Sequence, residues 1–121
     1  MKSTLVVGLS GRKTCEVTPE HTTDHAARPV LATPSMIGLM EWTCLEVTAD
    51  HIDADEATVG IHVCVSHESA VMLGELIDIA VELTEISGRK MTFRTLITGP
   101  RGRVSEGTHQ RAVIKLASTA R

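Results

Sequence analysis

The stretch from residue 32 to residue 45, ATPSMIGLMEWTCL, most constrains the fold, because it carries the strongest helical signals in the chain. Thr33 is typical of an N-cap, and Pro34 suits the first helical position, where a missing N–H costs nothing. The sequence therefore predicts a helix from about Pro34 to about Ala49. Its apolar side chains recur at the spacing of a single buried stripe: Met36, Ile37, Met40, Cys44 and Leu45.

Glu41 lies within this stripe, one turn after Ile37 and one turn before Leu45. Burying a carboxylate without a partner is unfavourable, and groups perturbed in this way cluster at functional sites. In a second interpretation, Glu41 lies at the edge of the stripe, in water or paired to a basic residue. Thr33 is likewise either a plain helix cap or a catalytic hydroxyl. The pattern leaves both pairs of alternatives open.

Length and composition fit one domain spanning residues 1–121, with 42% hydrophobic and 22% charged residues. A net charge of -3 with scattered basic residues argues against nucleic acid as a partner. The only aromatic side chains, Trp42 and Phe93, are expected in the core. The apolar run at residues 5–9 is too short for a membrane span and lacks a signal-peptide pattern, so we expect a cytoplasmic protein without a membrane partner.

The three cysteines have neither metal-ligand nor redox spacing. We expect reduced thiols, two of them in the core. His21 and His25 are four residues apart, but the segment is not convincingly helical and no third ligand is placed nearby. No metal site is therefore predicted.

The rest of the chain predicts strands around the helix. Two short β-like runs, 4–9 and 14–18, precede it, and the acidic segment 50–56 is expected to be a solvated loop. Period-two alternation predicts four strands after it, at 57–67, 76–86, 91–97 and 104–116. Turn residues at 87–90 and 99–102 indicate antiparallel hairpins. The predicted architecture is α+β: one long central helix, a four-stranded meander and one or two N-terminal strands.

Several motifs lie on this framework. They are A-T-x-x-M-x-G-L-M-E-W-x-C from Ala32, G-x-x-x-C-V-x-H from Gly60, Gly74, Gly88-Arg89, and G-T-H-x-R-A-V-I from Gly107. A long helix wrapped by a curved antiparallel sheet is the hotdog arrangement. Over residues 32–116, the motifs together resemble the fluoroacetyl-CoA thioesterase family of hotdog proteins.

The resemblance implies a dimeric enzyme that hydrolyses acyl-CoA thioesters, with coenzyme A as part of the substrate and no separate cofactor. The family's catalytic residues match Thr33, Glu41 and His67, and its substrate-contacting residues match Gly60 and Arg111. It also implies that the sheets of two copies join edge to edge and that each active site draws residues from both chains. In the family enzyme a longer, phenylalanine-rich segment before the helix forms a lid. Here residues 25–31 are shorter and contain no aromatic residue, which predicts no strict selectivity for fluoroacetyl-CoA.

Two other functions stay open at this point. One is a hotdog hydratase or dehydratase acting on an enoyl-CoA, although the usual Asp-x-x-x-x-His pattern of that group is missing. The other is a non-catalytic module that binds acyl-CoA. Within the thioesterase hypothesis, Glu41 or Thr33 can be the nucleophile, or Glu41 can orient a water. Arg111 can bind part of the substrate or hold a carboxylate, and His109 has a similar ambiguity.

Overall fold

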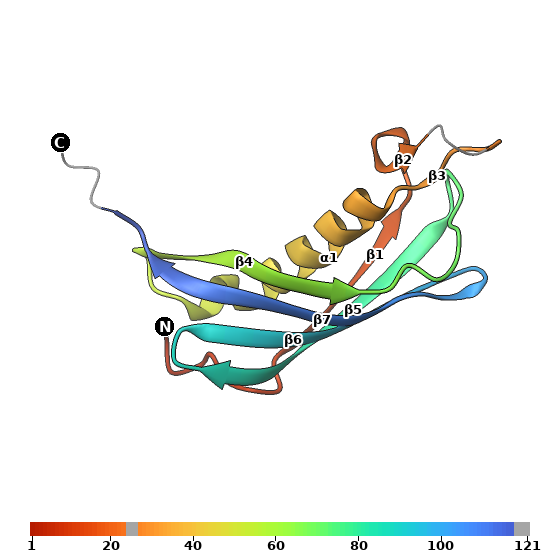
Figure 1. Cartoon of the computed structure of the whole chain (residues 1–121). Coiled ribbons are helices and arrows are strands. Elements are labelled where there is room, and N and C mark those ends of the chain that lie inside the picture. Colours follow the sequence, from red (N-terminus) through yellow and green to blue (C-terminus); the bar gives the residue numbers. More distant parts are fainter. Residues whose placement is uncertain (24–26, 118–121) are drawn as a thin grey trace.

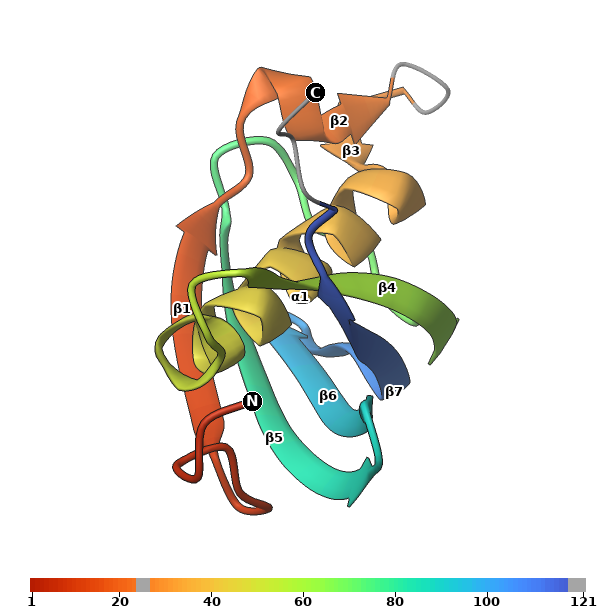
Figure 2. The ribbon, with the colours of Figure 1, turned by 90° about the vertical axis from the view of Figure 1, so that its left-hand side faces the viewer.

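One long helix lies against the concave face of a five-stranded antiparallel sheet in the computed structural model, which describes residues 1–23 and 27–117 (Figures 1 and 2). This confirms the predicted helix wrapped by a curved sheet. The strands are β1 (Ser10–Glu16), β2 (Thr22–Thr23), β3 (Val30–Leu31), β4 (Glu56–Val65), β5 (Leu76–Ser87), β6 (Lys90–Gly99) and β7 (Gly102–Lys115). The helices are α1 (Thr33–Thr48) and two short 3-10 turns, η1 (Pro19–His21) and η2 (Ala49–His51).

The order of strands in the main sheet is β1-β5-β6-β7-β4. Strands β5, β6 and β7 form the expected hairpins, but β4 pairs with β7 and not with β5. The predicted four-stranded meander is therefore wrong. The chain between β4 and β5, residues 66–75, passes from one side of the sheet to the other. As a result β4 and β1 are the two edges of the sheet (Figure 2).

Of the one or two N-terminal strands expected from the runs at 4–9 and 14–18, one joins the main sheet. This strand, β1, pairs with β5 and includes residues 10–13, which separate the two runs. Gly11 lies directly against the helix, because a Cβ there would come within 2.6 Å of the Val47 side chain. Pairing with β5 and close packing under α1 thus place residues 10–13 in a strand, although they lie outside both runs.

Helix α1 begins one residue earlier than predicted. Ala32 is its N-cap without a side-chain cap, so the N-cap assignment of Thr33 is wrong. Proline is tolerated just behind it, because N–H groups in the first turn have no helical partner. The predicted stripe is also rotated. Its fully buried members are Met36, Met40, Thr43, Cys44 and Thr48.

This rotation places two other helix residues differently from the sequence pattern. Glu41 lies at the edge of the buried face, as in the second interpretation above, and its side chain is 35% exposed. Trp42 is 58% exposed, so its expected place in the core is wrong, whereas Phe93 is fully buried as predicted. Of the cysteines only Cys44 is buried, against the two expected.

Strand β4 carries a β-bulge. Gly60 pairs with Arg111 and His62 pairs with Gln110, so Ile61 is one extra residue on the β4 side. The period-two alternation predicted for residues 57–67 is therefore interrupted at Ile61. Before the bulge Gly60 faces the helix, and after it Val63, which is paired with the buried His109, takes that side.

Glu56 at the start of β4 is buried, although the acidic segment 50–56 was expected to be solvated. Its carboxylate accepts hydrogen bonds from the amino group of Met1, the backbone N–H of Asp53 and, at 2.8 Å, Arg89 Nη2. These bonds, the one from Met1 above all, lower the pKa of Glu56 to about 2. Paired charges thus replace solvent at this end of the sheet.

Candidate active site

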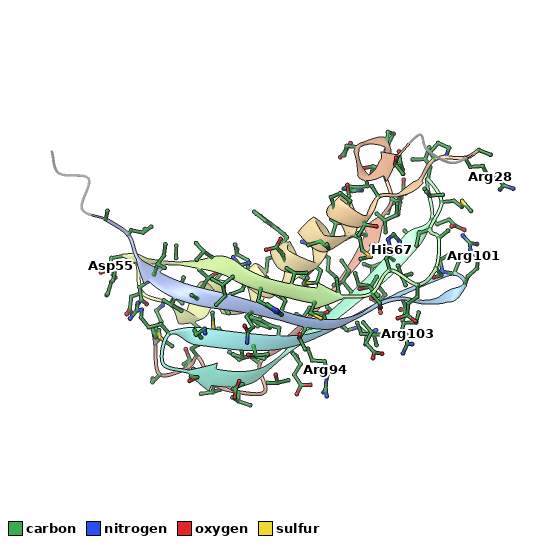
Figure 3. The ribbon with its side chains drawn as sticks, viewed as in Figure 1. Arg28, Asp55, His67, Arg94, Arg101 and Arg103 are labelled. Atoms are coloured by element: carbon green, nitrogen blue, oxygen red, sulfur yellow. The ribbon has the colours of Figure 1, made fainter. Side chains whose placement is uncertain are left out.

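The first group of predicted site residues lies at the N-terminus of α1. The Thr33 hydroxyl is hydrogen-bonded to Nδ1 of His67 at 2.8 Å. His67 follows β4, in the connection to β5 (Figure 3). The side chains of Thr33 and His67 are both exposed. His67 also lines a hollow of about 250 Å³, whose lining residues are Val30, Leu31, His67, Glu68, Ser69 and Ala70. The free N–H groups of a helix N-terminus favour negative charge, so this place suits an oxyanion or a carbonyl oxygen.

The second group surrounds Glu41 in the middle of α1. Its Oε2 lies 3.5 Å from Nη1 of Arg111 and 3.6 Å from Nε2 of His109. The Arg111 side chain is 5% exposed and that of His109 is fully buried. Glu41 is therefore partly open to solvent on one side and is contacted from β7 on the other.

Arg111 is fixed from three directions. Its Nε donates to Thr58 Oγ1 and its Nη2 donates to the Thr58 carbonyl, both at 3.0 Å. Its Nη1 lies 3.2 Å from Nε2 of His109. The guanidinium is thus held by β4 and β7 with Nη1 toward Glu41. Of the two roles considered for Arg111, holding a carboxylate is the one that these contacts support.

Gly60 lies directly beside the carboxylate of Glu41. A Cβ at this position would come within 2.5 Å of Glu41 Oε2 and 3.2 Å of His109 Cε1. Any side chain would therefore displace the carboxylate or the ring. The absence of a Cβ explains physically why glycine fits here, next to the bulge at Ile61.

His109 belongs to this cluster, although sequence reasoning gave it little support. Its Nδ1 is hydrogen-bonded to the His62 carbonyl at 2.8 Å. Burial lowers the pKa of its imidazole, while the His62 carbonyl and Glu41 act in the opposite direction. The signal that could have found it is spacing, because residues two apart on a strand share a face and His109 is two residues before Arg111.

The two groups are separate within one chain. Thr33 and Glu41 are eight positions apart on α1, which is about 12 Å along the helix axis. Within residues 1–23 and 27–117, no hydrogen bond or ion pair joins Glu41 to Thr33 or His67. The structure thus brings Thr33 to His67, and Glu41 to Gly60 and Arg111, but does not unite the three residues expected to be catalytic.

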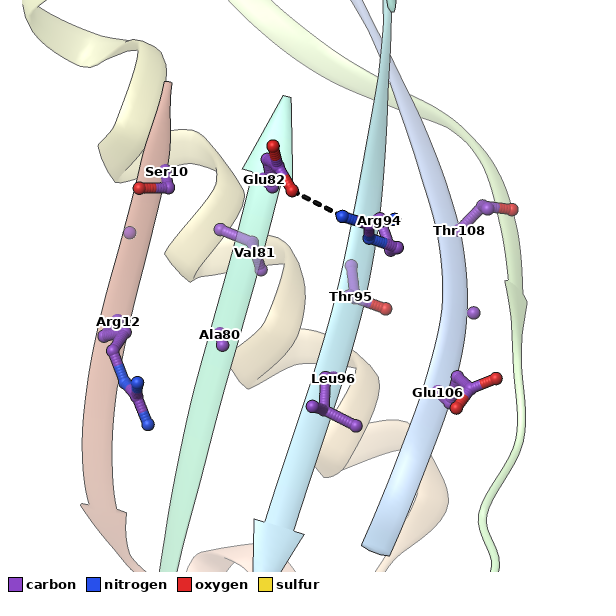
Figure 4. Close-up of a pocket in the computed structure, with 12 residues that line it drawn as sticks. Ser10, Arg12, Ala80, Val81, Glu82, Arg94, Thr95, Leu96, Glu106 and Thr108 are labelled. Carbon is purple, nitrogen blue, oxygen red and sulfur yellow. Dashed lines mark hydrogen bonds and ion pairs between the residues drawn. The ribbon is translucent and has the colours of Figure 1, made fainter. Parts of the chain in front are cut away.

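A larger hollow of about 570 Å³ lies on the sheet face opposite the helix, over β1, β5, β6 and β7 (Figure 4). Glu82 and Arg94 form an ion pair across it at 2.6 Å. It contains none of the predicted site residues. The described part of the chain has no cluster of three side chains suited to hold a metal ion, and none of its helices has the length and apolar character needed to cross a membrane.

Comparison with known proteins gives a consistent result. The family model for fluoroacetyl-CoA-specific thioesterase matches residues 14–117. The fluoroacetyl-CoA thioesterase of Streptantibioticus cattleyicolor is 36% identical over 87 residues, which make up 72% of this chain and 63% of that protein. The match therefore spans less than two thirds of that relative.

Solved structures extend the match to nearly the whole fold. The fluoroacetyl-CoA thioesterase FlK aligns with a TM-score of 0.86 and 30% identity, over 93% of this chain and 90% of that chain. A mutant of FlK in complex with fluoroacetate and CoA aligns with a TM-score of 0.87 and 31% identity, over 93% and 97%. A hot-dog-like protein from Thermanaerovibrio acidaminovorans shares the fold at 18% identity, with a TM-score of 0.83 over 90% and 83%. The hotdog prediction is confirmed.

Proposed function

Because the chain belongs to the fluoroacetyl-CoA-specific thioesterase family, we propose that it hydrolyses an acyl-CoA thioester to the free acid and CoA. The observation that carries the proposal is the carboxylate of Glu41, held by Arg111 over the backbone of Gly60. The solved relative in complex with fluoroacetate and CoA supports the same substrate class. The reaction uses no cofactor apart from the CoA of the substrate, and a cytoplasmic location stays a prediction.

Thioester hydrolysis adds water across the C–S bond, so the acyl carbon gains oxygen and the leaving sulfur gains a proton. In the proposed mechanism Glu41 orients the water or attacks the carbonyl itself, and His67 moves a proton to the leaving thiolate. Thr33, beside the free N–H groups of α1, hydrogen-bonds within the site or acts as the nucleophile. Each route needs both groups of residues around one substrate.

We propose further that a second copy brings the two groups together. β4 is an edge strand with exposed apolar side chains, namely Val59, Ile61 and Val63. An exposed edge of this kind is open to pairing with another chain. The opposite edge, β1, carries Arg12 and Lys13, and charges of this type discourage pairing.

Two-fold pairing of β4 with its copy would run antiparallel. It sets the end of one β4, which leads to His67, toward the first half of the other, whose last residue is Gly60. The Glu41 group of one copy would then approach the Thr33 and His67 group of its partner. Light scattering at micromolar concentration tests this arrangement, and a monomer would contradict it.

The catalytic proposal is tested by release of free thiol from short, branched, aromatic and halogenated acyl-CoAs. On the best substrate, we expect Glu41→Gln and His67→Ala each to lower kcat by about 10²- to 10⁴-fold, and Thr33→Ala to lower it less. If both variants stay within a few-fold of the wild type, the assignment is wrong. Turnover of an enoyl-CoA without thiol release would support a hydratase. Binding of CoA esters without turnover would support a binding module.

We also propose that the enzyme lacks strict selectivity for fluoroacetyl-CoA. Residues 24–26 lie outside the described part of the chain, and residues 27–31 contain no aromatic side chain. Apolar contacts discriminate weakly between small groups, since even a whole methylene is worth only about 1 to 3 kcal/mol. The test compares kcat/KM for fluoroacetyl-CoA and acetyl-CoA. A thousand-fold preference for the fluorinated substrate would overturn the proposal.

A further inference from the structure

His109 has no role in the mechanism above, yet its ring is fully buried at the centre of the Glu41 group. It pairs with Val63 of β4 and Phe93 of β6 in the sheet register, so its strand neighbours on both sides are apolar. Only its two ring nitrogens have polar contacts. A buried imidazole with both nitrogens engaged is in a defined orientation and tautomer.

The two contacts determine where the ring proton lies. Nδ1 faces the carbonyl of His62 at 2.8 Å, and a carbonyl oxygen can only accept, so Nδ1 carries the hydrogen. In the neutral ring Nε2 then has a free lone pair. It lies 3.2 Å from Nη1 of Arg111, which is always a donor. His109 therefore accepts a hydrogen bond from Arg111.

The surrounding charges fit a neutral ring. Burial opposes a second proton on the ring most strongly, and the charges of Arg111 on the same strand and of the His62 side chain on β4 oppose it as well. The His62 carbonyl and Glu41 of α1, which faces Nε2 at 3.6 Å, favour it, but the pKa of His109 is lowered overall. A proton on Nε2 would direct two N–H groups at each other and remove the acceptor of Arg111.

We propose that His109 is a positioning residue, whose Nε2 accepts from Arg111 and thereby directs the guanidinium toward the carboxylate of Glu41. Its kinetic consequence rests on the thioesterase function proposed above. The ring does not contact the substrate in this role. It acts on the reaction only through Arg111, by fixing the direction of Glu41.

A matched pair of variants tests the acceptor. Glutamine and leucine are both uncharged and branched beyond Cβ, but only glutamine presents an oxygen near the place of Nε2. We expect His109→Leu to lower kcat by about 10- to 100-fold with KM little changed, because a charged donor loses its acceptor. We expect His109→Gln to stay within a few-fold of the wild type. Equal losses in both variants, or a loss confined to KM, would overturn the proposal.

A second measurement needs no activity and no variant that risks misfolding. Nitrogen NMR of the wild-type protein at about pH 7.5 should show His109 with a hydrogen on Nδ1 and none on Nε2. The side-chain N–H signals of Arg111 should be protected from exchange with solvent. A protonated Nε2 would overturn the inference. The expected NMR result without turnover of any acyl-CoA would instead count against the proposed function alone.

Discussion

The two groups of site residues differ in how firmly they are held. Thr33 and His67 share one hydrogen bond at the exposed N-terminus of α1. Glu41, in contrast, contacts Arg111, which is itself held by Thr58 and His109. One half of the proposed site is thus open to a ligand, while the other half is fixed before any ligand arrives. Catalysis by preorganised charge needs the fixed half, and entry of a substrate needs the open one.

Mixing two inactive variants is the strongest test of whether these halves work across two chains. In a mixed dimer of Glu41→Gln and His67→Ala, one site collects both substitutions and the other collects none. Random mixing should restore about a quarter of wild-type activity, from variants that each retain about 1% or less. Co-expression or refolding of the two chains together, followed by thiol-release assay, measures this. If each site lies within one chain, mixing restores nothing.

Gly60→Ala should disturb the fixed half of the site, where the backbone of Gly60 lies beside the carboxylate of Glu41. The added Cβ would lie within 2.5 Å of Glu41 Oε2, so the carboxylate must move away from its place against Arg111. We expect kcat to fall by about 10- to 100-fold. Gly38→Ala is the matched control, because it lies on α1 with no atom within 4 Å of the added Cβ. It should raise the free energy of unfolding by about 0.5 to 1 kcal/mol. Unchanged kcat in Gly60→Ala would show that the carboxylate position is not critical.

The free energy of unfolding should also distinguish the halves. Arg111→Met leaves Nε2 of His109 and the carboxylate of Glu41 without their common partner. We expect a loss of about 1 to 3 kcal/mol in denaturant unfolding. Thr33→Ala, at an exposed position, should change stability by about 0.5 kcal/mol or less. Similar losses in the two variants would contradict the difference in how the halves are held.

The smallest effect concerns the pH dependence of stability. Burial lowers the pKa of His109 from its ordinary value of 6.5, so the unfolded chain takes up a proton more readily than the folded one. The neutral His109 ring therefore contributes fully to the free energy of unfolding above about pH 6.5. This contribution is lost as the pH falls toward the lowered pKa. The slope is at most about 1.4 kcal/mol per pH unit. Denaturant unfolding at pH 7.5 and 5.5 should show a larger loss for the wild type than for His109→Gln. Equal losses would mean that the ring titrates normally.

The hairpins β5-β6 and β6-β7 could be predicted from sequence, because alternation and turn residues are local signals. The buried face of α1 could not. Thr43 and Thr48 are buried in place of Ile37 and Leu45, since the direction of the helix is set by strands distant in sequence. The position of β4 beside β7 depends equally on distant partners.

The residues of the candidate site could likewise be predicted from the sequence only in part. The motifs identified Glu41, Gly60 and Arg111, which the structure brings together, and also Thr33 and His67, which it pairs. They gave no reason to prefer His109, because its importance comes from burial and from the lone pair that it presents to Arg111. The separation of Thr33 from Glu41 follows from the predicted helix, since eight positions span about 12 Å. The hydrogen bond between Thr33 and His67 could not be predicted, because it depends on the three-dimensional course of the chain after β4.

Because of the bulge at Ile61, the alternation of side chains between the two faces of the sheet is shifted by one residue along β4. Even-numbered residues face the helix before it, and odd-numbered residues face the helix after it. Deleting this single residue would exchange inside and outside for every later position of the strand, and substitutions at individual positions could not repair that. A designer who transplants the Glu41 site into another hotdog scaffold must therefore carry over the irregularity of the strand together with the residues that line the site.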